Sequence, residues 1–240
     1  GGNAGAPDWT VSETCAQLPG PTGAAPPQAS AGVGCNYYNF WTNTAVNGTR
    51  IQSAYFELWR EVARRYGRNP AVPIFDLQNE PFGGPIPPGI FEPVYLYPFY
   101  RQLAAAVREH APEVVIGFQP EIFHSIGVPT PFALPIGIDN AIYLPHEYTA
   151  AYLTQRLDPA YPPGQDAVTR SYLGITRTEA GLFGTPYLIG ETGWTRSTAA
   201  DGVEGPIPAT DPTAPPAFAR DFAALADEQL FGWAWFAYSS

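Results

Sequence analysis

One stretch of the chain reads Val72-Pro73-Ile74-Phe75-Asp76-Leu77-Gln78-Asn79-Glu80-Pro81. Its first part is apolar and favours a strand, and Pro81 then removes a backbone donor and fixes φ. We therefore expect a buried strand that stops where Glu80 is presented. A carboxylate at the C-terminal end of a buried strand is a candidate for chemistry. Taken alone, the motif is equally compatible with a surface acid in a loop.

Strands and helices are expected to alternate on both sides of this stretch. Further apolar runs predict strands at Val114 to Gln119, Ala141 to Pro145, Tyr187 to Gly190 and Gly232 to Phe236. Residues on one helical face predict four helices, which start with Thr49 as N-cap, near Pro98, at Asp166 and before Phe218. The crossovers are long enough for parallel pairing, so the pattern is typical of an α/β fold.

Polar residues repeatedly follow the predicted strand ends, which is how a (β/α)8 barrel builds its active site. Only five strands are predicted, whereas closure of such a barrel needs eight. A doubly wound open sheet is the alternative, but no Gly-rich phosphate loop follows any of the strands. The sequence therefore predicts a TIM barrel that is incomplete in this chain.

The first 48 residues show no sustained helical or strand period and are rich in Gly and Pro. We expect a long loop before the first helix, within one domain that covers residues 1–240, because a hydrophobic content of 45% supports one core. Cys15 and Cys35 lie in this loop and predict a disulfide that stabilises by roughly 3 kcal/mol. Two isolated thiols are the alternative. A disulfide would indicate an oxidising compartment and a secreted, extracellular protein.

The composition narrows the classes of partner. A net charge of −10 argues against nucleic acid and anionic membranes, and no apolar run is long enough to span a bilayer. The three His residues show no metal-ligand spacing, and there is no Ser-centred nucleophile elbow. We therefore expect a neutral substrate and neither a metal nor a cofactor, and the sequence does not indicate an oligomeric state.

Two carboxylates suggest the chemistry. Glu80 and Glu191 end two predicted strands that are separated by two others, so in a barrel they would face each other across its mouth. Carboxyl groups about 5–5.5 Å apart allow one to act as nucleophile and the other as acid and then base, which is retaining glycoside hydrolysis. The two pKa values must then differ. Asn79 is placed to hold a sugar hydroxyl, and the Tyr148 phenol to donate to the nucleophile.

Three motifs carry a resemblance to a known family. They are Phe75-Asp76-Leu77-Gln78-Asn79-Glu80-Pro81-Phe82-Gly83, His146-Glu147-Tyr148 and Ile189-Gly190-Glu191-Thr192-Gly193. They resemble the glycoside hydrolases of clan A, family five. Two further matches resemble the endoglycoceramidase-like branch of that family, at Gly5-Ala6-Pro7-Asp8-Trp9 and Asn39-Phe40-Trp41.

This resemblance implies roles for individual residues. Glu80 would be the acid/base at the end of strand four, and Glu191 the nucleophile at the end of strand seven. Asn79 would bind the 2-hydroxyl group. His146 and Tyr148 would be the contacts from strand six.

The resemblance also implies an aromatic floor under the reacting sugar, for which Trp235 is the candidate and Trp233 the alternative. It further implies that the chain begins after strand three, so that strands four to eight are present. An Arg after strand two and a His after strand three would then be missing, which puts the activity of this chain by itself in doubt.

The predicted function is that of a secreted retaining β-glycosidase acting on an oligosaccharide or a glycolipid such as a glycosylceramide. Glu121, after the fifth strand of the family, is a candidate substrate contact, or else a structural acid. Apolar side chains after strands four and five favour a glycolipid, unless they are buried anchors: Phe82, Phe91, Tyr95, Tyr97, Phe123 and Ile126. A β-glucanase or mannanase of the same clan, or a non-catalytic sugar-binding or inactive fragment, are the alternatives.

Overall fold

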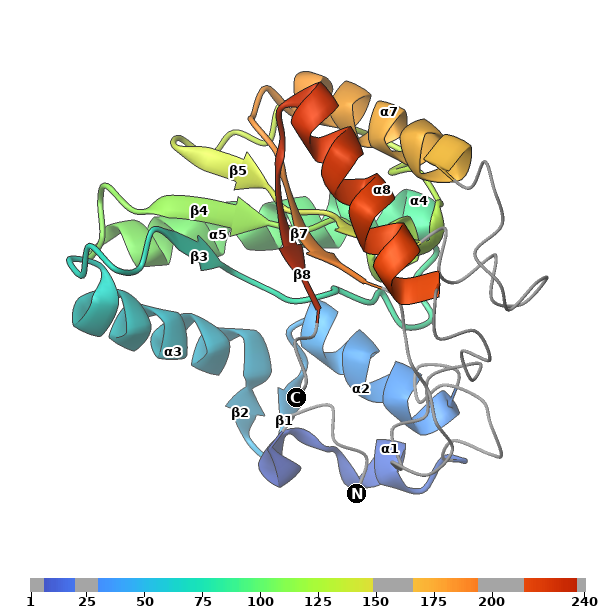
Figure 1. The fold of residues 1–240 in the computed structure, drawn as a ribbon. Coiled ribbons are helices and arrows are strands. Elements are labelled where there is room, and N and C mark those ends of the chain that lie inside the picture. The colour runs from blue at the N-terminus through green and yellow to red at the C-terminus, as the bar shows by residue number, and fades with distance from the viewer. Residues whose placement is uncertain (1–6, 20–29, 149–165, 194–213, 237–240) are drawn as a thin grey trace. The chain divides into compact units, whose positions relative to one another are not determined.

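A computed structural model of the 240-residue chain describes residues 7–19, 30–148, 166–193 and 214–236. The chain forms two compact units, of which the first comprises Gly1–Gly117 with Ile136–Asn140 and the second Phe118–Pro135 with Ala141–Ser240. Figure 1 labels their helices and strands. Among the helices of the described segments, none has the length and hydropathy needed to cross a membrane. Gly5 and Ala6, which contribute to the resemblance, lie outside the described residues.

The described residues in the N-terminal part of the first unit form three helices, so the expectation of a long loop before the first helix is wrong. It contains the 3-10 helix η1 (Asp8–Thr10), α1 (Glu13–Ala16) and α2 (Ala31–Trp41). Glycines hide the helical period of α2, but the Ser30 side chain caps it by accepting from the Val33 N–H. A Cys15–Cys35 disulfide with a Cα–Cα distance of 5.5 Å then joins α1 to α2, which confirms the predicted bridge.

The start of α3 (Ile51–Tyr66) also differs from expectation. Thr49 is not the N-cap, because it pairs with Val46 in a hairpin of β1 (Ala45–Val46) and β2 (Thr49–Arg50). The turn between these strands is Asn47-Gly48, whose φ values of 49° and 80° are those that a two-residue hairpin requires. This dipeptide is the sequence signal for the hairpin. Gly67 is the C-cap of α3.

The predicted strand before Glu80 is present as β3 (Ile74–Asp76), and it pairs in parallel with β4 (Val115–Phe118) in the first unit. Between them the chain forms α4 (Pro88–Ile90), the π-helix η3 (Phe91–Leu96) and α5 (Tyr97–Arg108). Buried Phe99 of α5 is the centre of an aromatic core, with ring centroids 5.3–5.9 Å from those of Phe40, Trp41, Tyr55 and Phe56. This core joins α2, α3 and α5.

The second unit holds the other strands. Its elements are η4 (Ile122–Ile126), β5 (Ala141–Tyr143), β6 (His146–Glu147), α7 (Asp166–Phe183), β7 (Leu188–Thr192), α8 (Ala214–Gln229) and β8 (Gly232–Trp235). β6, β7 and β8 form a parallel sheet in that order, and an isolated parallel bridge joins Tyr143 to Tyr187 just before β7. The alternation of strand and helix that the sequence predicted is therefore present in this unit.

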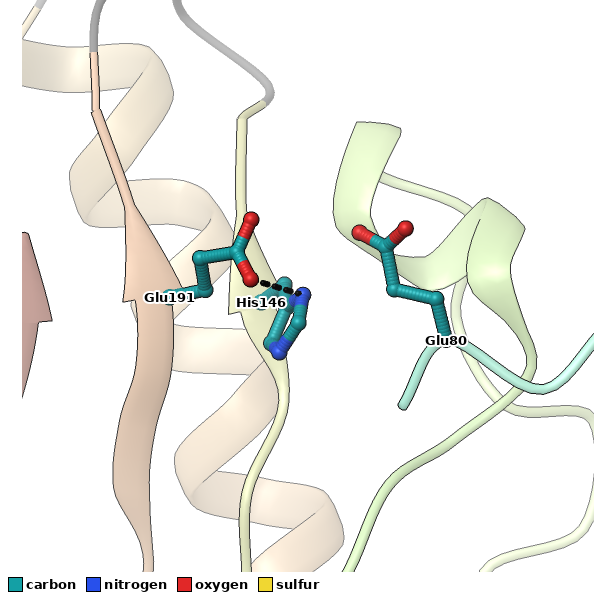
Figure 2. A group of neighbouring side chains, drawn as sticks. All are labelled: Glu80, His146 and Glu191. Carbon is teal, nitrogen blue, oxygen red and sulfur yellow. Dashed lines mark ion pairs between the residues drawn. The ribbon is translucent and has the colours of Figure 1, made fainter. Parts of the chain in front are cut away.

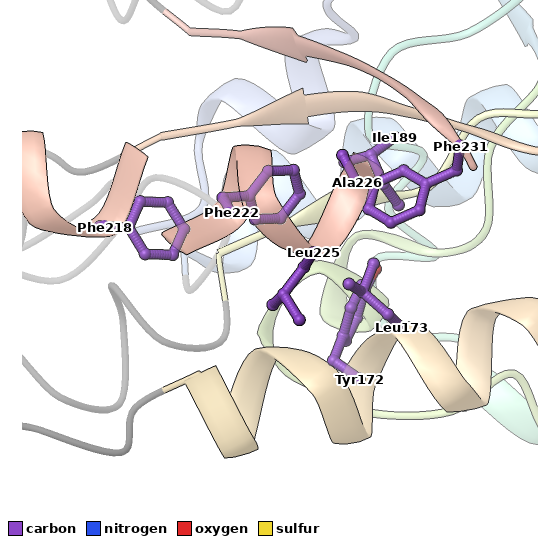
Figure 3. Close-up of a cluster of buried hydrophobic side chains, with 8 residues drawn as sticks. All are labelled: Tyr172, Leu173, Ile189, Phe218, Phe222, Leu225, Ala226 and Phe231. Atoms are coloured by element: carbon purple, nitrogen blue, oxygen red, sulfur yellow. The ribbon is translucent and has the colours of Figure 1, made fainter. Parts of the chain in front are cut away.

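One hydrophobic cluster fixes α7 and α8 against this sheet (Figures 1 and 3). Tyr172 and Leu173 reach it from α7, and Ile189 reaches it from β7. α8 contributes Phe218, Phe222, Leu225 and Ala226, which recur at helical spacing. The cluster defines the helix-facing side of the sheet, so functional side chains must leave the strands on the opposite side or at their ends.

Candidate active site

The backbone around Glu80 is anchored on both sides of the residue. Before it, the Tyr55 hydroxyl of α3 donates to the Leu77 carbonyl at 2.8 Å. After it, the Trp41 indole N–H of α2 donates to the Phe82 carbonyl at 2.7 Å. Trp41 is buried, so its indole serves as an anchor for this backbone. Both anchors act within the first unit.

Glu80 itself has an unusual backbone conformation. Its φ is 42°, which lies in the left-handed region that side chains other than Gly rarely adopt. The following Pro81 disfavours helical conformations at this position as well. Such a conformation costs about 1–3 kcal/mol and persists only where the surroundings impose it. Nearby, burial raises the pKa of Tyr37 and the negative charge of Glu80 raises it further, so this phenol stays protonated beside the carboxyl group.

This strain leads to a stability prediction. Glu80→Gly is expected to be about 1 kcal/mol more stable than Glu80→Ala, because Gly adopts a positive φ without a steric penalty. Both variants lack the carboxylate, so the comparison isolates the backbone. Unfolding free energies from urea titration provide the measurement. Equal stability of the two variants would show that Glu80 is not strained.

Glu191 owes its orientation to an irregularity in β7. The register between β7 and β8 shifts by one residue between Ile189 and Thr192, which is a β-bulge at Gly190 and Glu191. Ile189 is fully buried in the cluster with α7 and α8. Strict alternation would place Glu191 on that same helix-facing side. The bulge instead turns its carboxylate away from the cluster, so it remains partly accessible.

Two residues from the end of β6 hold the Glu191 carboxylate. The Tyr148 hydroxyl donates to Oε1 at 2.5 Å, as the sequence predicted. His146 Nδ1 lies 3.6 Å from Oε2, and its residue is directly opposite Glu191 in the β6–β7 register (Figure 2). Each carboxylate oxygen therefore has a partner.

The predicted residues thus fall into two groups. His146, Tyr148 and Glu191 are brought together in the second unit. Exposed Asn79 and half-buried Glu80 follow β3 in the first unit. The distance between the Glu80 and Glu191 carboxyl groups stays a prediction.

The expectation for Trp235 needs revision. Its ring lies 6.0 Å from that of Phe218, and Trp233 lies 5.3 Å from Phe222, so both tryptophans pack toward α8. Because side chains alternate along a strand, Phe236 points to the side that Glu191 occupies, and it is 60% exposed. Phe236 therefore replaces Trp235 as the candidate for the sugar floor. The backbones of Gly193 and Phe236 lie close together, since a Cβ at Gly193 would be 2.1 Å from the Phe236 carbonyl oxygen.

Glu121 has a structural role in the second unit. Its carboxylate accepts from the Phe123 N–H at 2.9 Å and caps η4, and the residue is only 5% exposed. A contact between Glu121 and substrate stays a prediction.

The apolar residues after the strands differ in exposure. Phe82, Phe91 and Tyr97 are buried anchors, which corrects the interpretation of these three as an apolar surface. Phe123 is exposed, and the same segment of the second unit exposes three more apolar side chains that the sequence analysis missed: Val128, Phe132 and Leu134. These four residues, 41–63% exposed, form what we call the apolar segment.

Comparison with known proteins assigns the family. Residues 35–239 match the family described as Cellulase (glycosyl hydrolase family 5). The comparison with curated proteins found no match.

Solved structures show the same fold. Endo-glycoceramidase II from Rhodococcus sp. matches in its ganglioside GM3 complex, with a TM-score of 0.80 and 23% identity over 98% of this chain and 51% of that one. Its lactosyl-enzyme intermediate matches with a TM-score of 0.77 and 24% identity, over 98% of this chain and 50% of that one. An endogalactoceramidase structure matches with a TM-score of 0.75 and 20% identity, over 98% of this chain and 46% of that one.

The chain therefore spans about half the length of the solved chains that it resembles. The likeness confirms the predicted (β/α)8 barrel fold, of which the described parallel strands form an open part. Together with the family match over most of its length, it shows that the chain belongs to glycosyl hydrolase family 5.

Proposed function

We propose that the protein containing this chain is a retaining β-glycosidase, with Glu191 as nucleophile and Glu80 as acid/base. The observation that carries the proposal is the Glu191 carboxylate, which a bulge aims away from the core and which Tyr148 and His146 hold by its two oxygens. A carboxylate nucleophile must attack one carbon atom from one direction, so a fixed orientation favours this role. The lactosyl-enzyme intermediate of the Rhodococcus protein supports a covalent route.

The proposed reaction has two displacements. In the first, a Glu191 oxygen bonds to the anomeric carbon while the Glu80 carboxyl donates its proton to the glycosidic oxygen, and the alcohol leaves. In the second, the Glu80 carboxylate takes a proton from a water molecule whose oxygen attacks the anomeric carbon. The bond to Glu191 then breaks, and both carboxyl groups return to their starting states. Two inversions give net retention of configuration.

We further propose that the substrate is a glycolipid. The apolar segment supports this, because exposed apolar side chains in one segment are suited to binding an apolar aglycone. The ganglioside complex of the Rhodococcus protein supports the same class of substrate. The Cys15–Cys35 disulfide supports secretion, which the presence of the protein in culture supernatant would test.

Hydrolysis of a ceramide-linked oligosaccharide tests the function and the substrate class together. The protein carrying this chain is expected to release the oligosaccharide with its anomeric configuration retained, as followed by NMR. Phe132→Ser with Leu134→Ser is expected to raise KM for the glycolipid about tenfold, because burial of exposed apolar side chains contributes about 1–2 kcal/mol. KM for a soluble aryl glycoside should not change.

Exposed Leu182 on α7 lies outside the apolar segment, and Leu182→Ser serves as the control that should change neither KM. Turnover of cellulosic or mannan oligosaccharides with none of the glycolipid would instead identify a β-glucanase or mannanase. An inverted product would exclude double displacement. Binding of oligosaccharide without turnover would identify a non-catalytic sugar-binding protein.

A further inference from the structure

A buried polar cluster in the second unit has no part in the reaction as proposed. Glu179 of α7 contacts His124 of η4, with 2.6 Å between Oε2 and Nε2. The Tyr143 hydroxyl donates to the same carboxylate oxygen at 3.0 Å, and the Thr130 N–H donates to the other oxygen at 2.9 Å. Burying an acid and an imidazole is unfavourable unless each is paired. The number of hydrogen bonds that Glu179 and His124 make here therefore indicates a specific arrangement of these two side chains.

The cluster continues to the strand that holds the nucleophile. The Tyr172 hydroxyl contacts His124 Nδ1 at 2.7 Å and donates a hydrogen bond to the His146 carbonyl. A carbonyl only accepts, so the single hydroxyl proton of Tyr172 belongs to that bond. Burial raises the pKa of Tyr172, chiefly by desolvation, and the hydroxyl therefore keeps this proton. His124 Nδ1 must then be protonated and donate to the Tyr172 oxygen.

The η4 helix thus holds the end of β6 at two points. His124 acts on the His146 carbonyl through Tyr172, and the neighbouring Ser125 carbonyl accepts from the Tyr148 N–H at 2.8 Å. His146 and Tyr148 each contact an oxygen of Glu191. β6 has only two residues, so few hydrogen bonds of its own sheet fix its backbone. A shift of this backbone would move both partners of the carboxylate.

We propose that His124 and Glu179 are positioning residues for Glu191, acting through Tyr172 and the backbone of His146. The proposal rests on the proposed function insofar as Glu191 is the nucleophile. The His124–Glu179 contact orients the imidazole, the imidazole orients the Tyr172 hydroxyl, and this hydroxyl fixes the strand residue opposite Glu191. If the cluster only stabilised the fold, loss of the Tyr172 hydroxyl would affect kcat no more than loss of any other hydrogen bond of the cluster.

The test compares two tyrosines that contact this cluster and are almost fully buried. Tyr172→Phe removes the hydroxyl that donates to the His146 carbonyl, and Tyr143→Phe removes the hydroxyl that donates to Glu179 within the cluster. Both variants should lose thermal stability to a similar degree. Only Tyr172→Phe should lower kcat, by about 10- to 100-fold with KM nearly unchanged, because small misplacements of reacting groups have effects of this size. Steady-state kinetics well below the unfolding temperature provide the measurement.

A second pair of variants applies if Tyr172→Phe does not fold. His124→Asn places an amide N–H near the Nδ1 position and keeps the donor to Tyr172, whereas His124→Gln places its amide near Nε2 and loses that donor. The Asn variant should retain kcat within a few-fold, and the Gln variant should not. Equal kcat losses within either pair, or no loss in Tyr172→Phe, would overturn the proposal.

A readout without turnover separates this proposal from the proposed function. The chain has three His residues, so the imidazole ¹⁵N signal of His146 can be assigned by substitution. It should shift in Tyr172→Phe and stay in place in Tyr143→Phe. If the unsubstituted protein hydrolyses no glycoside, the proposed function fails, and the His146 signal alone decides whether the link exists. An unchanged signal in Tyr172→Phe would then refute the link.

Discussion

Glu191→Ala is expected to lower kcat for glycoside hydrolysis by about 10⁴-fold or more, because loss of a catalytic nucleophile removes the covalent route. Azide should restore turnover, since the smaller side chain leaves room for an external nucleophile beside the anomeric carbon. The azide attacks from the face that Glu191 occupied, and no second displacement follows. A β-glycoside should therefore give an α-glycosyl azide, which NMR identifies.

Glu228→Ala is a suitable control for this experiment, because Glu228 is an exposed carboxylate paired with Arg170 on the outer helices. Its removal should leave kcat unchanged. If Glu191→Ala kept most of its activity, or gave a β-glycosyl azide, another residue would have to be the nucleophile.

Glu80→Ala is expected to have an effect that depends on the leaving group. A ceramide or sugar alcohol needs a proton as it departs, so turnover of such substrates should fall about 10²- to 10⁴-fold. A dinitrophenolate leaves without a proton, so formation of the glycosyl-enzyme from that glycoside should change little. Rapid-mixing measurements should show a burst of phenolate, because the second step still lacks its base.

Azide then distinguishes the two carboxylates. In Glu80→Ala it attacks the glycosyl-enzyme in place of water, and the product should be a β-glycosyl azide. This is the opposite configuration from that expected for Glu191→Ala. If the two products were exchanged, the roles of Glu80 and Glu191 would be exchanged as well. If Glu80→Ala slowed both glycosides equally, Glu80 would not be the proton donor.

The sequence predicted those parts of the fold and site that depend on local chemistry. The apolar residues before Asn79-Glu80-Pro81 predicted a strand, and β3 is present there, although it ends at Asp76 and not next to Pro81. The contact between Tyr148 and Glu191 was predictable because each follows a recognisable strand motif. These features depend on a few neighbouring residues.

Other features depended on contacts that no local pattern contains. α2 has glycines where a helix favours other residues, and capping, the disulfide and aromatic packing stabilise it nonetheless. The direction of Trp235 depends on which side of β8 faces α8, and the sequence does not reveal that side. His124 and Glu179 are 55 residues apart, and only their common burial reveals the cluster.

The extra residue at Gly190 and Glu191 also affects how related sequences should be compared. A strand with this bulge differs from a regular one as if by a single-residue insertion, so an alignment that preserves strict strand periodicity would move Glu191 into a neighbouring column. Grafting β7 onto another scaffold raises the same difficulty. A copy in which all residues of β7 followed the regular alternation would keep the packing of Ile189 and direct the Glu191 carboxylate into the helix layer.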